Sequence, residues 1–83
     1  MNTEIKLDYP IEVDGQTVDT LKMRRAKVCD QEVADRQPTP VQQEIALFSN
    51  LCEVEPAAIR ELDLLDYQKI QETYKGFLSP KKS

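Results

Sequence analysis

The chain has 83 residues, of which 40% are hydrophobic and 31% charged, and its formal net charge is −4. This length supports one small domain, residues 1–83, with a thin core, and the acidic balance argues against nucleic acid as the main partner. No apolar run approaches the roughly 20 residues of a membrane span, and no basic flank followed by an apolar stretch marks a signal peptide.

Residues 4–25 are predicted to form one long β-hairpin. Apolar side chains occupy every second position of the first half, so they share one face of a strand, and mostly charged residues take the other face. Asp14-Gly15 then tolerates the positive φ angles of a two-residue type I′ turn. This turn would pair Val13 with Gln16.

The second strand carries a conflict of side-chain parity. If Val18 points to the apolar face, Leu21 and Met23 point to water. We therefore predict one extra residue near Asp19-Thr20, because a β-bulge resets the alternation. The resulting pairs would be Ile11 with Val18, Tyr9 with Leu21, and Leu7 with Met23.

A basic cluster, residues 21–28, lies where the second strand becomes a connector, and a mobile connector, residues 30–40, is expected next. Two interpretations of the cluster stay open: a solvated strand end that balances acidic neighbours, or a docking edge for an acidic partner segment. Asp30 is predicted to cap a short, weak helix through Arg36. Two prolines then break the chain, so we expect 30–40 to be the most mobile internal stretch.

The helical part, residues 41–78, has a strong start signal. Thr39 is predicted as the N-cap and Pro40 as the first helical residue, with Gln42 reaching back as in a capping box. This helix should end near Glu53. Its apolar face is predicted to carry Val41, Ile45, Phe48 and Cys52, widened by Leu47 and Leu51.

Two further helices are predicted. Pro56 opens a short helix with Ile59 and Leu62 facing inward, and Asp63 caps the last helix. A loose basic tail, 79–83, follows. The fold is therefore expected to be α+β, with an N-terminal β-hairpin followed by three to four short helices packed on one face. The stripe of the last helix comprises Tyr67, Ile70, Tyr74 and Phe77.

Catalytic chemistry finds little support in the sequence. The chain has no histidine and two glycines, which excludes a histidine proton shuttle and a glycine-rich phosphate loop. Asp63 and Asp66 are interpreted as helix-capping residues rather than as paired catalytic carboxylates. Cys29 and Cys52 lack metal-site spacing and are expected to be buried, reduced thiols, with a disulfide as the alternative. We expect no enzyme activity, no metal and no cofactor.

A small DNA-binding regulator is the alternative function. Residues 44–62 have the apolar spacing of a helix-turn-helix. Against this interpretation, Glu55, Glu61 and Asp63 would repel phosphate where the second helix must approach DNA.

A partner-binding module is the preferred function. The end of the last helix carries apolar side chains that a small core need not cover, and the open edge of the hairpin is a second candidate. The simpler interpretation, in which these side chains pack on the hairpin, also stays open. The predicted binding ridge comprises Leu47, Leu51, Ile70, Tyr74, Phe77 and Leu78.

Two runs of residues carry a family resemblance that covers nearly the whole chain. They are Tyr9-Pro10-Ile11-Glu12-Val13-Asp14-Gly15, Val18, Leu21, Met23-Arg24-Arg25, Lys27-Val28 and Asp30, then Glu44-Ile45-Ala46-Leu47, Leu51, Pro56, Ile59, Leu62-Asp63-Leu64, Asp66-Tyr67 and Gly76-Phe77-Leu78. In these runs the chain resembles the small tail assembly chaperones of Mu-like and related contractile-tailed phages. It departs from them at Ala26, where proline is common, and at Cys52-Glu53, where glycine is common.

The resemblance implies a non-catalytic chaperone of a phage or prophage that binds and solubilises the tape measure protein during tail morphogenesis. Tape measure proteins are long, helical and apolar, so the apolar stripes of their unassembled chains need to be shielded from water. The implied place of action is the host cytoplasm, with absence from the mature virion. The implied partners are the tape measure protein and a longer, frameshifted form of the chain itself, with self-association as a further option and with neither nucleic acid nor membrane.

Overall fold

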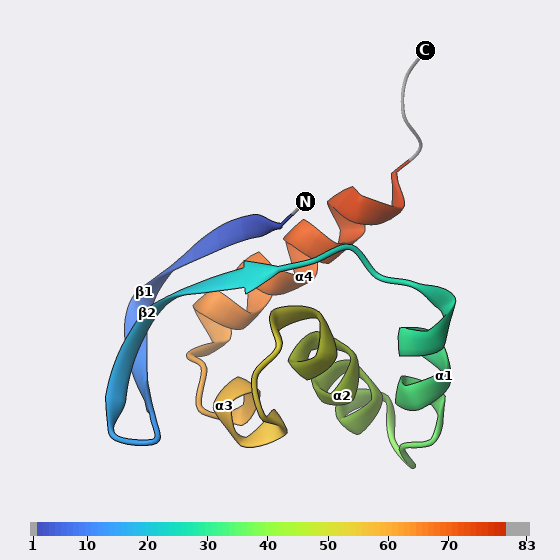
Figure 1. Ribbon diagram of the computed structural model, residues 1–83, viewed down its shortest axis with the longest axis horizontal. Coiled ribbons are helices and arrows are strands. Elements are labelled where there is room, and N and C mark those ends of the chain that lie inside the picture. The colour runs from blue at the N-terminus through green and yellow to red at the C-terminus, as the bar shows by residue number, and fades with distance from the viewer. Residues whose placement is uncertain (1, 80–83) are drawn as a thin grey trace.

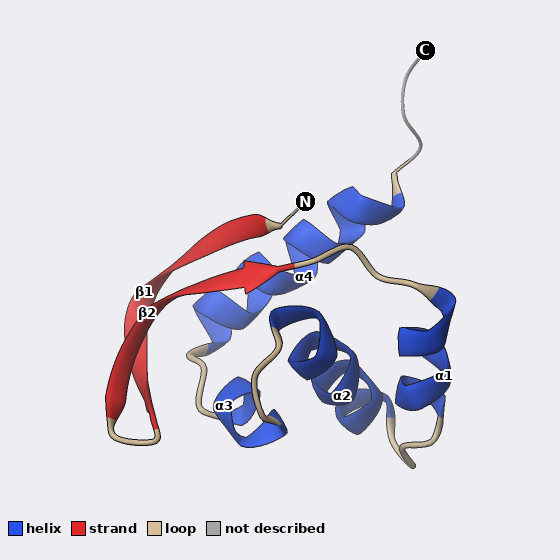
Figure 2. Cartoon of the chain, viewed as in Figure 1, coloured by secondary structure: helices blue, strands red, loops and turns tan. Residues whose placement is uncertain are grey.

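The computed structural model describes residues 2–79, which form a two-stranded antiparallel sheet and four helices (Figure 1). The predicted α+β arrangement is confirmed, and Figure 2 shows the hairpin preceding all the helices. Met1 and residues 80–83, most of the predicted basic tail, lie outside the described residues. The elements are β1 (Thr3–Val13), β2 (Gln16–Met23), α1 (Val28–Asp35), α2 (Pro40–Cys52), α3 (Pro56–Arg60) and α4 (Leu64–Leu78).

The hairpin turn agrees with its prediction. Asp14 and Gly15 adopt φ values of 52° and 78°, as a two-residue turn of the mirror-image type requires. Gly15 adopts its left-handed φ at little cost because it has no Cβ atom. The two predicted pairs beside the turn both form, Val13 with Gln16 and Ile11 with Val18.

The predicted bulge in β2 is wrong, although the parity conflict behind it is real. The register shifts between Lys6 and Ile11, so that four residues of β1, 7–10, lie opposite Asp19 of β2 alone. The extra residues therefore belong to β1, where Pro10 has no N–H group to donate to a ladder. Beyond the shift the observed pairs are Lys6 with Thr20, Ile5 with Leu21, and Thr3 with Met23, in place of the predicted ones.

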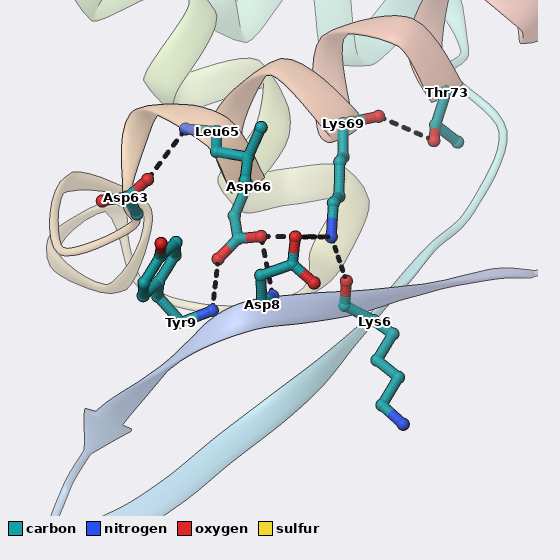
Figure 3. Close-up of polar contacts among 8 residues, drawn as sticks. All are labelled: Lys6, Asp8, Tyr9, Asp63, Leu65, Asp66, Lys69 and Thr73. Atoms are coloured by element: carbon teal, nitrogen blue, oxygen red, sulfur yellow. Dashed lines mark hydrogen bonds and ion pairs between the residues drawn. The ribbon is translucent and has the colours of Figure 1, made fainter.

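A carboxylate of α4 holds the irregular stretch of β1 (Figure 3). The backbone N–H groups of Asp8 and Tyr9 donate to Asp66 Oδ1 and Oδ2, over 2.9 and 3.0 Å. Lys69 Nζ lies 3.4 Å from Asp66 Oδ1 and 3.1 Å from Asp8 Oδ2, and it donates to the Lys6 carbonyl. The predicted capping role of Asp66 is therefore wrong. Its carboxylate instead accepts from two amides in the stretch where the register shifts.

Helix α1 starts earlier than predicted, with Lys27 as its N-cap. Asp30, the predicted cap, is the third helical residue and is 3% exposed. Its carboxylate accepts from the Lys27 backbone N–H and, over 2.8 Å at each oxygen, from Arg24 Nη1 and Nη2. The Arg24 hydrogen bonds outweigh burial and lower the pKa of the Asp30 carboxyl. The connector 30–40 thus contains most of a helix, and its mobility stays a prediction.

Helix α2 starts and ends as predicted. Thr39 Oγ1 accepts from the backbone N–H of Gln42 over 3.2 Å, while the Gln42 side chain accepts from the Thr39 hydroxyl rather than from its amide. Glu53 ends the helix in the left-handed conformation, with φ of 56°. Val41, predicted to face inward, is 65% exposed. It lies in the first turn, whereas the last turn of α2 is the part that bonds to the segment following β2.

Helices α3 and α4 also begin as predicted. Pro56 opens α3, and both Ile59 and Leu62 are buried. The Asp63 side chain caps α4 by accepting from the backbone N–H of Leu65 over 3.0 Å. These starts follow from local signals, because proline fixes the helical φ and aspartate satisfies a free amide.

Helices α2, α3 and α4 contact the hairpin, and the core has an aromatic centre. Helix α4 contacts β1, α2 contacts β2, α3 contacts β1, and α1 packs against α2 (Figure 1). The buried Phe48 ring lies edge-on to the rings of Tyr67 and Tyr74, each with a centroid distance of 5.7 Å. Over residues 2–79, none of the helices has the length and apolar character that crossing a membrane requires.

The two cysteines differ, and the prediction that both are buried is wrong for one of them. Cys52 is buried at the end of α2, and burial raises the pKa of its thiol to about 11. Cys29 is exposed in the first turn of α1. Both thiols are free.

Candidate partner-binding surface

Three residues of the predicted ridge belong to the core. Leu47, Leu51 and Ile70 are 6%, 0% and 0% exposed, and all three lie in the main hydrophobic cluster. Because hydrophobic binding scales with the apolar area removed from water, they offer a partner little surface in this conformation. Their part in binding stays a prediction, and in the fold they help to fill the core.

The other three predicted residues lie in the last turns of α4, and we call them the α4 ridge: Tyr74, Phe77 and Leu78. Phe77 and Leu78 follow Tyr74 by three and four positions, so both are neighbours of Tyr74 on the helix surface. Leu78 is 62% exposed, whereas Tyr74 and Phe77 are partly buried against the core. The ridge therefore has one largely exposed side chain beside two aromatic rings that pack against the core.

Two arginines of the basic cluster are engaged within the chain. Arg25 Cζ lies 5.6 Å from the centroid of the Phe77 ring, and Arg25 Nη2 donates to the Phe77 carbonyl over 2.9 Å. This places a cation at the carbonyl end of α4, where the helix dipole favours positive charge. Arg24 is paired with Asp30, which agrees with the interpretation that the cluster balances acidic neighbours. A docking edge would have to use the exposed Lys22 and Lys27.

A second apolar surface, which the sequence analysis missed, lies where α3 ends and α4 begins, beside the first turns of α2. It is an open pocket of about 240 Å³, and two of its side chains, Val41 and Leu64, are 65% and 76% exposed. Leu64 precedes Tyr67 by three positions, so extending the stripe of α4 by one turn would have found it. The α2–α4 groove, as we call it, is lined by Val41, Ile45, Ile59, Arg60, Leu62, Leu64 and Tyr67.

A carboxylate bonds to one of the residues that line this groove, Tyr67. Glu44 Oε1 accepts from the Tyr67 hydroxyl and, over 3.0 Å, from Gln71 Nε2. Burial, together with the hydrogen bond to Glu44 and its charge, raises the pKa of Tyr67, so the hydroxyl remains a donor. Among residues 2–79, no lysine or arginine forms a salt bridge with Glu44. The groove thus joins an apolar pocket to a held negative charge.

Across residues 2–79, no group of three His, Cys, Asp or Glu side chains is arranged to hold a metal ion. On α3 and its flanks, Glu55, Arg60 and Glu61 are all exposed, so the face that a helix-turn-helix would present to DNA is mainly acidic.

Comparison with known proteins gives a family match over most of the chain. Residues 4–79 match the model of a family described as phage tail assembly chaperone proteins, E, or 41 or 14. A search of curated proteins and a search of solved structures gave no significant match. The matched range contains the α4 ridge, the α2–α4 groove and nearly all of the hairpin.

Proposed function

Because the chain belongs to the family of phage tail assembly chaperones, we propose that it binds and solubilises the tape measure protein while the tail is built. The role is non-catalytic, is performed in the cytoplasm of the host, and leaves the chaperone outside the mature virion. The family match over residues 4–79 is the observation that carries this proposal. We further propose that the tail is of the contractile type. A longer, frameshifted form of the chain is a second proposed partner in tail assembly.

The α4 ridge is the proposed contact with the client. Leu78 is 62% exposed at the end of its helix, and the rings of Tyr74 and Phe77 continue the apolar surface toward the core. A long apolar helix of the client would bury this surface along with its own. The buried members of the predicted ridge, Leu47, Leu51 and Ile70, would support it from beneath.

Co-expression with the tape measure protein tests the proposal. We expect the chaperone to raise the soluble fraction of the client, and Leu78→Asp to remove most of that gain by placing a charge in the contact. Val28→Asp is the matched control, because Val28 is an exposed apolar residue on α1, at 79% exposure. Both variants alter exposed side chains, and circular dichroism checks that both remain folded.

The outcomes separate the function from its site. If the wild-type chain leaves the client as insoluble as it is alone, the proposed function is wrong. If the wild type solubilises the client and Leu78→Asp does so equally well, the function holds and the α4 ridge is not the contact.

A further inference from the structure

We propose that the α2–α4 groove is a second docking site, which takes a basic amphipathic helix by burying one apolar side chain and pairing a lysine or arginine with Glu44. This site lies at the start of α4, whereas the α4 ridge lies at its end. Leu64 and Leu78 are the first and last residues of that helix, so about 21 Å of helix axis separates them. The inference does not depend on which protein supplies the helix.

The pocket has room for a large apolar side chain. Its volume is about 240 Å³, which is roughly the volume of eight water molecules in the liquid, at about 30 Å³ each. An isoleucine, leucine or phenylalanine side chain fits this space. Val41 and Leu64 stand exposed beside it, so a partner would also cover apolar surface that now faces water.

The charges around the pocket select a basic partner. Glu44 follows Val41 by three positions on α2, so the two are neighbours on the helix surface, and its carboxylate accepts from the hydroxyl of the lining residue Tyr67. Tyr67 and Gln71 hold Glu44 Oε1 in place, so the carboxylate is oriented before a partner arrives. Arg60 is the one charged lining residue, and the exposed Glu61 and Asp63 are the chain neighbours of the lining residue Leu62.

A helix is the occupant whose spacing matches these features. On a helix, an apolar residue and a lysine three or four positions apart lie about 5–6 Å apart on one face. Val41 and Glu44 have the same spacing on α2, so one turn of the partner can meet both. An acidic helix would place its carboxylates near Glu44, and like charges would weaken its binding.

Binding of two designed peptides tests the inference. The first is an amphipathic helix with leucine on one face and lysine on the other, and the second has glutamate in place of every lysine. Titration is followed by amide shifts in NMR spectra and by fluorescence anisotropy. We expect the lysine peptide to shift the amides of Val41, Ile59 and Leu64, and to bind at least about tenfold more tightly than the glutamate peptide.

Two variants locate the contacts. Glu44→Gln keeps an acceptor for Tyr67 and removes the charge, and it should weaken the lysine peptide about threefold or more, with a smaller loss at high salt. Leu64→Ser, at an exposed position, should weaken it about tenfold. Glu72→Gln and Val28→Ser are the matched controls, one an exposed carboxylate and one an exposed apolar residue away from the groove, and neither should change affinity.

Three results would overturn the inference. They are equal binding of the two peptides, shifts confined to the α4 ridge, and unchanged affinity in both groove variants. Concentration-dependent dimerisation that Leu64→Ser abolishes would assign the groove to a second copy of the chain instead. None of these results bears on whether the chain solubilises the tape measure protein, which the co-expression experiment decides separately.

Discussion

Asp66 Oδ1 lies 2.9 Å from the backbone nitrogen of Asp8, and this hydrogen bond joins residues 58 positions apart in the chain. Its partner oxygen accepts from the next amide along β1, and the side chain is fully buried. The contact therefore sets where α4 crosses the hairpin. Because the α2–α4 groove lies at one end of α4 and the α4 ridge at the other, it also sets the positions of both candidate surfaces.

Replacing Asp66 should destabilise the protein strongly. Asp66→Ala leaves two strand amides without an acceptor, which we expect to cost about 2–4 kcal/mol in the free energy of unfolding. Asp66→Asn keeps one acceptor oxygen and should lose less. Urea unfolding followed by circular dichroism measures both. Asp63→Ala is the control, because it removes only a helix cap and should cost about 1 kcal/mol. A loss from Asp66→Ala no larger than that of Asp63→Ala would contradict the anchoring role.

The same carboxylate should make stability depend on acid pH. Burial opposes ionisation of Asp66, but the amides of Asp8 and Tyr9 and the Lys69 ammonium outweigh it and lower the pKa of the carboxyl. The stability it contributes is therefore complete well above the unfolded pKa of about 3.9 and is lost as pH falls toward and through the lower folded pKa.

Unfolding free energies of the wild type and Asp66→Asn, measured between about pH 7 and pH 3, check this prediction. The gap between the two proteins should be largest near neutral pH and should narrow in acid. The other carboxylates, including Asp30, are common to both proteins and cancel in the difference. A gap that stays constant or widens as pH falls would show that the ionised form of Asp66 is not the stabilising one.

Glycine at the end of α2 should stabilise the fold. Glu53 has φ of 56°, a left-handed conformation that costs a residue with a Cβ atom about 1 kcal/mol. Part of that gain is offset by the greater freedom of glycine in the unfolded chain, so we expect Glu53→Gly to add about 0.5 kcal/mol. Glu55→Gly, at φ of −72°, should give no gain. Thermal unfolding of the two variants distinguishes them, and equal midpoints would refute the strain at Glu53.

The two thiols should react at different rates with a disulfide reagent such as 5,5′-dithiobis(2-nitrobenzoate). Cys29 is exposed, whereas Cys52 is buried and burial raises its pKa to about 11. We expect one fast equivalent in the native protein at neutral pH and a second only after denaturation. Cys29→Ser should abolish the fast phase. Two fast equivalents from the native wild type would mean that the end of α2 opens readily.

The local elements were predictable from sequence, because neighbouring residues decide them. The Asp14-Gly15 turn, the Thr39-Pro40 start of α2 and the Asp63 cap of α4 depend on interactions within a few positions. The position of Tyr74, Phe77 and Leu78 on one side of α4 followed from helical spacing in the same way, while their role in binding stays a prediction. The complete burial of Leu51 and Ile70 could not be predicted in this way. An apolar stripe shows which side of a helix faces other elements, but the fraction that they cover depends on the tertiary packing.

The sequence by itself thus determined a hairpin, the starts of α2, α3 and α4, and most of the apolar side of α2 and α4. Only the tertiary structure decided that the extra residues lie in β1, that Asp66 reaches their amides, and that Val41 and Leu64 border a groove beside Glu44. The physical reason is distance along the chain. A cap needs a donor two or three residues away, whereas a strand amide that loses its ladder partner can be satisfied by any acceptor that folding brings near it.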